Sequence, residues 1–592
     1  MQNSETKICK NCKQNFTIEP DDFSFYEKLN VPPPTWCPDC RFVRRISFRN
    51  EINLYKRPCD SCKKQIISVY SAAAKFPVYC NSCWFSDKWS GSDYALDVNF
   101  SLPFLEQIKT LLDTVPHLAL AQLKNVNSEY SNYSAENKNC YLVVSALQSE
   151  DCAYSARLFY SRDCLDCLDI SNCERCYECI RVDKSSNSTY CSYSENLVDC
   201  HYCFDCRGLM DCFGCVGLRN KNHHWLNEAV SKEEYERRKS LFGSNPSFRK
   251  DCMQKYKKLL ETVPRRYAYV LKSVNSIGDN ITQSKNCRNC FFVKNVENAK
   301  YVFAGRELKD FMDASYDDNS QLDYEIMSGE RDYHVVFATN CWYSRELMYS
   351  NFCTDSSNLF GCVGLRNKEY CILNKQYSKE EYESLVPKII RHMGDMAYIS
   401  QGANGKEPIA YKFGEFFPLE FSPFAYNETV AQAYFPLTES EAAQRGYEWK
   451  SPVERNYEID LKIKDIPSIT EADESILSKT IECAHGGKCA DGCATAFKII
   501  PMEFQFYKKM RISIPELCPN CRYLRRLKSR NPMKLWSRLC QCAGTSSKNN
   551  LYKNIGAHQH GTEHCPNEFE TSYAPDRLDI VYCEACYNGE IA

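Results

Sequence analysis

Cysteines in CxxC pairs are the residues with the clearest chemistry in this sequence of 592 residues, 38 of which are cysteine. Two such pairs supply the four thiolates of one tetrahedral zinc site. Four pairs lie within residues 1–90, enough for two sites: Cys9 and Cys12, Cys37 and Cys40, Cys59 and Cys62, Cys80 and Cys83. Because a four-thiolate site has no open coordination position, we expect these zinc ions to be structural.

Each zinc site needs a hairpin and a helix that bring its two pairs together. Residues that favour a helix follow the second pair of each set, in Cys37-Pro-Asp-Cys-Arg-Phe-Val-Arg-Arg and in Cys80-Asn-Ser-Cys-Trp-Phe. A knuckle, a hairpin and a helix carrying the last two thiolates form the treble-clef arrangement. We therefore predict a pair of four-cysteine zinc modules over residues 1–92.

The first module has a recognisable sequence context. Cys9-Lys-Asn-Cys-Lys-Gln-Asn-Phe, Phe25-Tyr-Glu-Lys and Cys37-Pro-Asp-Cys-Arg resemble the zinc-ribbon (treble-clef-like) family of small bacterial domains. The resemblance covers about the first 45 residues. It implies metal ligation by Cys9, Cys12, Cys37 and Cys40 and implies no activity. The longer chain resembles uncharacterised cysteine-rich bacterial proteins, which implies no function either.

The pattern recurs near the C-terminus, shifted by 481 positions, as a diverged duplicate over residues 481–592. The shift relates Cys12 to Cys493, Cys37 to Cys518, Cys40 to Cys521 and Cys59 to Cys540. Ala490 stands at the position of Cys9. For the third site we predict Cys489, Cys493, Cys518 and Cys521, with Cys483 and His485 as alternatives. For the fourth we predict Cys542, Cys565, Cys583 and Cys586, with Cys540 and His564 as alternatives. Either His558, His560 and His564 add a second metal, or they are solvated or hydrogen-bonded histidines.

Arginines form one face of the expected helix after each second pair. They recur at helical spacing as Arg41, Arg44, Arg45 and Arg49, and again as Arg522, Arg525, Arg526 and Arg530. Such a stripe suits contact with the phosphates of RNA or another polyanion. The alternative is a solvated face, or arginines that pair with the acidic middle of the chain.

Charge is unevenly distributed along a chain whose net charge is -2. Residues 1–90 carry +5 and residues 481–592 carry +4, which leaves -11 for the middle. No run of about 18 apolar residues exists, and the first residues are polar, so we expect neither a membrane span nor a secretory signal. We therefore predict a cytoplasmic protein, in which reduced thiols bind metal or pack as small apolar groups. The predicted cofactor is zinc, about four ions.

A period of three organises the middle of the chain. Between Ser128 and Leu218 every cysteine number leaves a remainder of two on division by three, and no residue in that register is charged. The pattern also aligns at twelve, as in the column Cys140, Cys152, Cys164, Cys176, Ser188, Cys200 and Cys212. Asn or Asp recurs just before this column, where a turn is expected. We predict a β-solenoid of twelve-residue coils, which resembles the insect antifreeze solenoids without their threonine rows and hence without their activity.

A second copy of this segment follows 147 residues later. Phe213-Gly-Cys-Val-Gly-Leu-Arg-Asn-Lys returns from Phe360 onward, and the later cysteines keep the same remainder. Helices ending near Pro116 and Pro264, and helices capped at Ser231 and Ser378, are expected to cover the ends. The predicted fold is multidomain, with terminal zinc modules flanking two tandem β-solenoids over residues 97–243 and 245–390. An aromatic, proline-dotted strap and linker occupies residues 391–480.

The repeated thiols have two interpretations. They either bind soft metals or iron–sulfur clusters, or cycle as disulfides, or they simply fill the coil interior, as the exchange of Ser and Cys within columns favours. An outward column also aligns between the copies, running Tyr154, Asp166, Glu178, Tyr190 and Tyr202 against Tyr301, Asp313, Glu325, Phe337 and Tyr349. Such a row either stacks on bases or a partner's side chains, or packs between coils.

No catalytic motif is found: the sequence has no phosphate-binding glycine loop, no HExxH and no nucleophile elbow. The first hypothesis is therefore a non-enzymatic zinc-binding scaffold that binds nucleic acid, RNA above all, through its arginine helices. Its acidic solenoids would either space the two ends or recruit protein. A thiol-rich metal-binding or redox protein is the second hypothesis. A purely structural assembly protein is the third.

Overall fold

The computed structural model describes residues 3–401, 407–451, 457–489 and 492–591. They divide into two compact units, and each unit draws on two separate parts of the sequence. Unit 1 comprises Met1–Leu120 and Ala268–Lys450, and unit 2 comprises Ala121–Tyr267 and Ser451–Ala592. Each unit therefore combines cysteine modules from one end of the chain with a sheet that lies far away in sequence.

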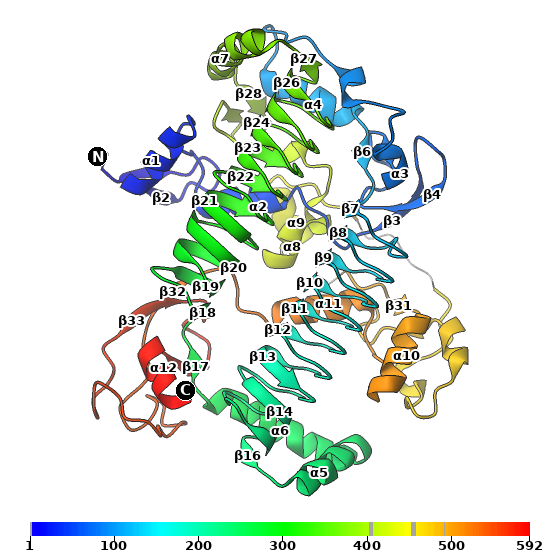
Figure 1. Ribbon diagram of the computed structural model, residues 1–592, viewed down its shortest axis with the longest axis vertical. Helices are drawn as coiled ribbons and strands as arrows, with labels where there is room; N and C mark the ends of the chain where they lie inside the picture. The colour runs from blue at the N-terminus through cyan, green and yellow to red at the C-terminus, as the bar shows by residue number, and fades with distance from the viewer. Residues whose placement is uncertain (1–2, 402–406, 452–456, 490–491, 592) are drawn as a thin grey trace. The chain divides into compact units, whose positions relative to one another are not determined.

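A ten-stranded sheet, the first ladder, forms the centre of unit 2 (Figure 1). Its strands follow one another in chain order and pair in parallel, except for the last antiparallel pair. Partners lie twelve residues apart, as in Ala156 with Leu168 and Leu168 with Ile180. The strands are β7 Gln122–Leu123, β8 Asn132–Ala135, β9 Val144–Leu147, β10 Ala156–Phe159, β11 Leu168–Ser171, β12 Ile180–Asp183, β13 Ser192–Val198, β14 Arg207–Phe213, β15 Asn222–Trp225 and β16 Glu228–Ala229.

The period of three in the sequence has a backbone cause. Through most of the first ladder every third residue has a positive φ, including 51° at Asn139, 53° at Asp151 and 51° at Asp163. Asn and Asp tolerate this left-handed conformation better than other residues with a side chain, so the turn expected at this column is confirmed. The residue after each left-handed position points inward, and this register is buried from Ser128 to Cys215.

Backbone carbonyls explain why Ser and Cys exchange in the inward columns. Cys164 donates its thiol to the backbone oxygen of Arg162 at 3.2 Å, and the Ser155 hydroxyl donates likewise to Ala153 at 2.9 Å. The Ser155 hydroxyl also accepts the backbone N–H of Cys167 at 3.0 Å. Either side chain satisfies the same buried polar backbone, so a metal is not needed to explain the cysteines here.

A second ten-stranded ladder lies in unit 1 (Figure 1). It keeps the twelve-residue register over most of its length, but its first pair, Val270 with Ile281, is offset by eleven. The register shifts at Gly278, where a Cβ would lie 2.0 Å from the Cys290 backbone oxygen, so only glycine fits. The strands are β18 Val270–Leu271, β19 Ile277–Thr282, β20 Lys285–Lys300, β21 Arg306–Ser315, β22 Tyr324–Met327, β23 Tyr333–Thr339, β24 Arg345–Met348, β25 Ser357–Phe360, β26 Glu369–Ile372 and β27 Lys375–Gln376.

The cysteine modules are built from short hairpins and helices, as expected. In unit 1 they comprise β1 Glu5–Ile8, β2 Asn15–Ile18, α1 Pro20–Lys28, α2 Pro38–Ile46, β3 Tyr55–Pro58, β4 Gln65–Ser68, β5 Val78–Tyr79, α3 Asn81–Trp84 and η1 Gly91–Tyr94. In unit 2 they comprise β30 Ile481–Glu482, β31 Ala496–Phe497, α10 Pro501–Met510, α11 Pro519–Lys528, β32 Trp536–Leu539, β33 Glu568–Thr571, β34 Val581–Tyr582 and α12 Glu584–Ile591.

Four helices lie beside the ladders. They are α4 Phe104–Thr114, followed by β6 His117–Leu118, and α7 Lys379–Asp395 in unit 1, and α5 Lys232–Ser244 and α6 Pro246–Thr262, followed by β17 Arg265–Arg266, in unit 2. Ser231 and Ser378 cap α5 and α7 as predicted. The helix α4 precedes the first ladder in sequence but belongs to unit 1, not to the unit that contains this ladder. It packs in unit 1, where Phe104 and Ile108 lie against Gly361 near the end of the second ladder.

The aromatic strap closes over the core of unit 1. Phe416 and Phe417 are buried against Phe48 of the first module. Its elements are β28 Tyr398–Ser400, β29 Ile409–Tyr411, η3 Leu419–Phe421, η4 Tyr426–Glu428, α8 Val430–Tyr434 and α9 Glu439–Gln444, and α9 is capped by Thr438. The later part of the predicted strap and linker contains η5 Ile463–Asp465 and η6 Glu474–Ser478, while residues 452–456 lie outside the described part. None of the helices in the described ranges has the length and apolar character needed to cross a bilayer.

Candidate metal centres

The first four-cysteine group joins the β1–β2 hairpin to the start of α2. The ligand atoms of Cys9, Cys12, Cys37 and Cys40 lie within 4.8 Å of one another. Lys13 takes a left-handed conformation, φ 60°, which turns the chain back so that its N–H reaches the Cys9 backbone oxygen at 3.0 Å. Cys37 is the N-cap of α2, and its backbone N–H donates to Cys9 Sγ at 3.2 Å.

The second group repeats this geometry. Cys59, Cys62, Cys80 and Cys83 also lie with their ligand atoms within 4.8 Å. Lys63 has φ 63° and bonds to the Cys59 backbone oxygen at 2.9 Å. Cys80 is the N-cap of α3 and donates its N–H to Cys59 Sγ at 3.3 Å. The structure thus brings together all eight N-terminal cysteines that the sequence predicts as ligands.

The third group differs from the predicted set at one position. The structure gathers Cys483, Cys493, Cys518 and Cys521, so that Cys483, predicted as an alternative ligand, joins the group. The sulfur of Cys483 lies 4.0 Å from Cys521 Sγ. The N–H of Cys518 donates to Cys483 Sγ at 3.3 Å, the same bond that Cys9 accepts in the first group. Cys489 remains close, with its sulfur 3.7 Å from Cys521 Sγ. Ala490, which the shift of 481 aligns with Cys9, lies outside the described residues.

The fourth group is corrected in the same way. Cys540, Cys565, Cys583 and Cys586 lie together, and Cys540 replaces the predicted Cys542. The N–H of Cys583 donates to Cys540 Sγ at 3.2 Å. Cys542 instead lies in a neighbouring cluster with His558, His560 and Cys586. His564 is exposed, and its Nδ1 lies 2.9 Å from the Cys565 backbone oxygen.

Insertions explain both corrections. Ten positions separate Cys483 from Cys493, where three separate Cys9 from Cys12. Twenty-five positions separate Cys540 from Cys565, where a CxxC pair has three. A constant shift along the sequence therefore misaligns the first ligand of the third group. In the fourth group it aligns Cys59 with Cys540 correctly and misaligns the second ligand, Cys565. The first ligand is identified by its geometry: in all four groups its sulfur accepts the backbone N–H of the third cysteine.

The donor sets fit a tetrahedral ion. Two sulfurs bonded at about 2.3 Å to one tetrahedral zinc lie about 3.8 Å apart. The sulfurs are 3.6 Å apart for Cys12 and Cys37, 3.9 Å for Cys62 and Cys80, and 3.9 Å for Cys565 and Cys583. All of the cysteines are free of disulfides. These four groups therefore have the composition and spacing of metal sites.

The predicted arginine face of α2 is turned inward against the second ladder. Arg41, Arg44 and Arg45 are at most 2% exposed. Arg41 Nε donates to Asp313 at 2.9 Å, and Arg45 Nη1 donates to the same carboxylate at 3.0 Å. Arg44 Nη2 donates to Glu325 at 2.8 Å. Three guanidinium groups thus lie among carboxylates of the same chain.

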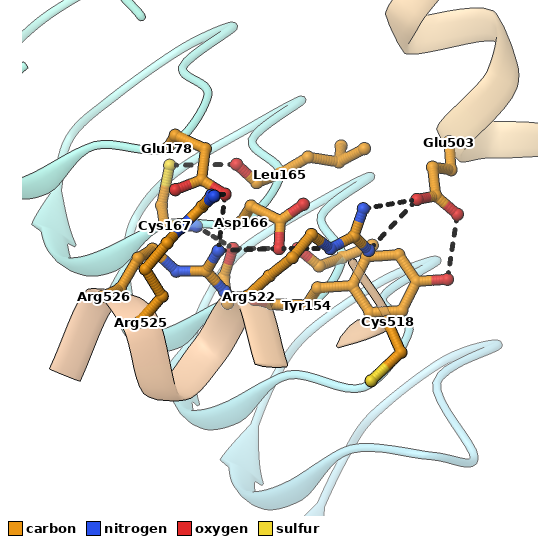
Figure 2. A network of polar contacts seen from close by, with 12 residues as sticks. Tyr154, Leu165, Asp166, Cys167, Glu178, Glu503, Cys518, Arg522, Arg525 and Arg526 are labelled. Carbon is orange, nitrogen blue, oxygen red and sulfur yellow. Dashed lines mark hydrogen bonds and ion pairs between the residues drawn. The ribbon is translucent and has the colours of Figure 1, made fainter. Parts of the chain in front are cut away.

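The duplicate helix α11 makes the corresponding contacts in unit 2 (Figure 2). Arg526 Nη1 donates to Asp166 at 2.8 Å and to Glu178 at 3.0 Å. Arg522 Nη1 donates to Glu503 of α10 at 3.1 Å, and Arg525 Nη2 donates to Glu178 at 2.7 Å. We call these two arrangements of arginines on ladder carboxylates the arginine latches.

Aromatic rings complete both latches. Tyr26 lies 5.5 Å from Tyr324 in unit 1, measured between ring centroids, and Tyr507 lies 5.7 Å from Tyr177 in unit 2. The guanidinium of Arg522 lies over Tyr154, a member of the aligned outward column, at 4.8 Å from its centroid. This part of the column is therefore covered by a module helix. The alignment of the two copies placed Asp313, Glu325, Asp166 and Glu178 in one outward column. The spacing of these carboxylates did not predict that they bind the arginines.

Because the charged groups of each latch are buried, the stability of the latch depends on the balance between its positive and negative charges. Burial raises the pKa of Glu325, although Arg44 and Arg45 act in the opposite direction. Burial is the largest single influence on the pKa of Arg41 and lowers it, but Asp313, Tyr26 and Tyr324 together raise the pKa by more, so it lies well above its ordinary value. Each charge is favourable only while its partner is present, because an unpaired buried charge is costly.

These contacts correct the expectation of a phosphate-binding face. Arg41, Arg44, Arg45, Arg49, Arg522, Arg526 and Arg530 are all buried. Arg525 alone among the eight predicted arginines is exposed, with 55% of its side-chain surface accessible. The alternative, in which the arginines pair with the acidic middle of the chain, describes both latches.

The ladder thiols lie apart from the metal groups and are deeply buried. Burial raises the pKa of Cys152, Cys164 and Cys179 well above the ordinary value for a thiol. A protonated, buried thiol is a poor nucleophile and a poor metal ligand. In the second ladder the same applies to Cys290 and Cys362. Hydrogen bonds from neighbouring thiols lower the pKa of Cys140 and Cys212 instead, and for Cys191 they outweigh burial.

Sequence comparisons assign no relative to this arrangement. No protein-family model matches the chain, and a search of curated proteins finds no match. The four-cysteine groups and the arginine latches are therefore the features from which a function can be inferred.

Proposed function

We propose that the chain is a zinc-stabilised scaffold. Each four-cysteine group would hold one structural zinc ion in a zinc-ribbon-like module, and each ladder would be a β-solenoid of twelve-residue coils. One observation carries the proposal: in the first and third groups, the helix that supplies the last two thiolates also carries the arginines of a latch. The thiolates Cys37 and Cys40 stand on α2, and Cys518 and Cys521 stand on α11.

Zinc is favoured by the chemistry of the donors. Four thiolates at tetrahedral spacing suit zinc, and they leave no position for a substrate or a water molecule. Modules of this size have too small a core to fold alone, so the ion contributes folding energy directly. In this scaffold the ion fixes the orientation of the helix, and the helix presents its arginines to the ladder carboxylates.

This proposal does not include phosphate binding by α2 and α11. Arg44 and Arg45 could reach a nucleic acid only if the latch opened, which would leave Asp313 and Glu325 buried without partners. The redox alternative is likewise not favoured, because the ladder thiols are buried and donate to backbone oxygens, as Cys164 does to Arg162 and Cys179 does to Tyr177. The geometry supports a structural role for both the thiols and the arginines.

Metal removal from the full chain tests the proposal. Hydrogen exchange is compared in α2, α11 and a central ladder strand such as β11, before and after treatment with a strong chelator. We expect protection to fall first in α2 and α11, because both helices depend on their zinc ions. Unchanged exchange in α2 and α11 after verified removal of the metal would contradict the proposal.

A further inference from the structure

A second cluster of metal-binding side chains adjoins the fourth four-cysteine group. The ligand atoms of Cys542, His558, His560 and Cys586 lie within 4.8 Å of one another. Cys586 also belongs to the group formed with Cys540, Cys565 and Cys583. One sulfur therefore faces two sets of three further ligands.

The ring of His560 is held in the orientation of a metal ligand. Its Nδ1 lies 2.7 Å from the backbone oxygen of Glu563, and its Nε2 lies 3.3 Å from Cys586 Sγ. A hydrogen bond from Nδ1–H to the carbonyl leaves the lone pair on Nε2, the nitrogen that faces the thiolate. Histidines that bind zinc commonly donate their other ring N–H to a carbonyl in this way.

His558 is supported by a carboxylate. Its Nε2 lies 2.9 Å from Glu590, and both side chains are at most 2% exposed. The Glu590 carboxylate is itself fixed, because it accepts the backbone N–H groups of Ile555 at 2.9 Å and Gly556 at 3.0 Å. A carboxylate beside the ring is an arrangement common to histidines that bind zinc.

Cys542 is enclosed in the same way. It is fully buried, and its sulfur accepts the side-chain N–H of Asn554 at 3.2 Å. The Tyr582 hydroxyl donates to the Asn554 side-chain oxygen at 2.7 Å and so fixes the direction of that amide. These two contacts hold the sulfur in place within the cluster.

We propose that this region holds two zinc ions bridged by the Cys586 thiolate. One ion would bind Cys540, Cys565, Cys583 and Cys586, and the other would bind Cys586, Cys542, His558 and His560. The inference rests on the proposed function, since it extends the zinc sites of that scaffold. Two ions and five thiolates with neutral histidines leave one net negative charge, a smaller imbalance than one ion with the same five thiolates. A bridge with bonds of about 2.3 Å keeps the ions within about 4.6 Å.

Metal counting on the full chain tests this site. Native mass spectrometry of zinc-loaded protein should find five zinc ions per chain. The double variant His558→Ala and His560→Ala should bind four, one fewer than wild type. The matched control His564→Ala changes an exposed histidine in the same loop and should keep five.

X-ray absorption at the zinc edge of wild type gives a second reading that does not depend on the variants folding. It should show zinc–nitrogen scattering and a zinc–zinc distance below about 4.6 Å. Four ions in both wild type and the double variant, with no zinc–zinc distance, would overturn the bridged pair and leave the proposed function intact. A full chain that binds no zinc at all would overturn both.

Discussion

Arg45 Nη1 donates to Asp313 Oδ1 at 3.0 Å, and neither side chain has measurable solvent exposure. The same relationship recurs between Arg526 and Asp166, at 2.8 Å. Each pair joins a helix of a cysteine module to a ladder residue that lies hundreds of positions away in sequence. Pairs of this kind orient the parts of a unit, because a charge at such depth must meet its partner.

Removing the carboxylate at the centre of one latch should destabilise unit 1. Asp313→Asn leaves Arg41 and Arg45 short of a buried counter-charge, so we expect the free energy of unfolding to fall by about 3–5 kcal/mol. Glu297→Gln is the control, because this glutamate of the same ladder forms an exposed ion pair with Lys285. Its effect should stay below about 1 kcal/mol. Equal effects of the two substitutions in denaturant unfolding would refute the latch.

Ladder thiols and module thiols should respond differently to the same substitution. In Cys164→Ser, the hydroxyl can donate to the same backbone oxygen, so the variant should keep its full metal content and its fold. In Cys40→Ser, one thiolate of the first group is lost, and the chain should release one metal ion and weaken around α2. Metal analysis of both variants, together with their thermal unfolding, checks this. Loss of metal from Cys164→Ser would instead support a metal site inside the ladder.

Gly278 should be intolerant of any side chain. Gly278→Ala places a Cβ on the Cys290 backbone oxygen at the register shift that begins the second ladder. We expect a loss of at least about 2 kcal/mol in the free energy of unfolding of unit 1. The control is Gly394→Ala in α7, where a Cβ meets no atom within 4 Å. A neutral Gly278→Ala variant would show that the observed register shift is not required.

The second ladder contains a pH-dependent weakness. Its interior includes Asp317, Asp323 and Asp332, and burial raises the pKa of Asp317 to about 7. Below about pH 4 this carboxyl is protonated in both the folded and the unfolded chain, so it has no effect. Between about pH 4 and pH 7 only the unfolded chain releases the proton, and stability falls by up to about 1.4 kcal/mol per pH unit.

Asp317→Asn should therefore remove part of this loss. We expect the variant to match wild type near pH 4 and to be more stable than wild type at pH 8. Urea unfolding across this range measures the difference. A difference between variant and wild type that does not change with pH would contradict the assigned titration.

The ladders and the N-terminal ligands could be predicted because local spacing determines them. A left-handed residue at every third position imposes a period of three on the sequence, and this period can be counted directly. A CxxC knuckle is likewise formed by residues that are adjacent in the sequence. The arginine faces could not be interpreted in this way. An amphipathic helix with arginines has the same pattern whether its partner is phosphate or a carboxylate 272 positions away, as Asp313 is from Arg41.

The C-terminal ligands were misassigned for a different reason. Cys483 and Cys540 are separated from their partner cysteines by insertions, and chain spacing says nothing about where an inserted loop returns. The structure reveals them through the N–H bonds that Cys518 and Cys583 donate to their sulfurs. The grouping of α4 with the second ladder was missed because order along the sequence does not determine which ladder a helix covers.

A count of bound metal and of reactive thiols on the native full chain tests the account most directly. The account predicts at least four zinc ions per chain and almost no thiol reactive toward a soluble disulfide reagent, with the part-buried Cys489 as the first to react. All 38 cysteines should react once the chain is unfolded with a chelator present. Native protein with fewer than four zinc ions, or with iron, disulfides or many reactive ladder thiols, would contradict it.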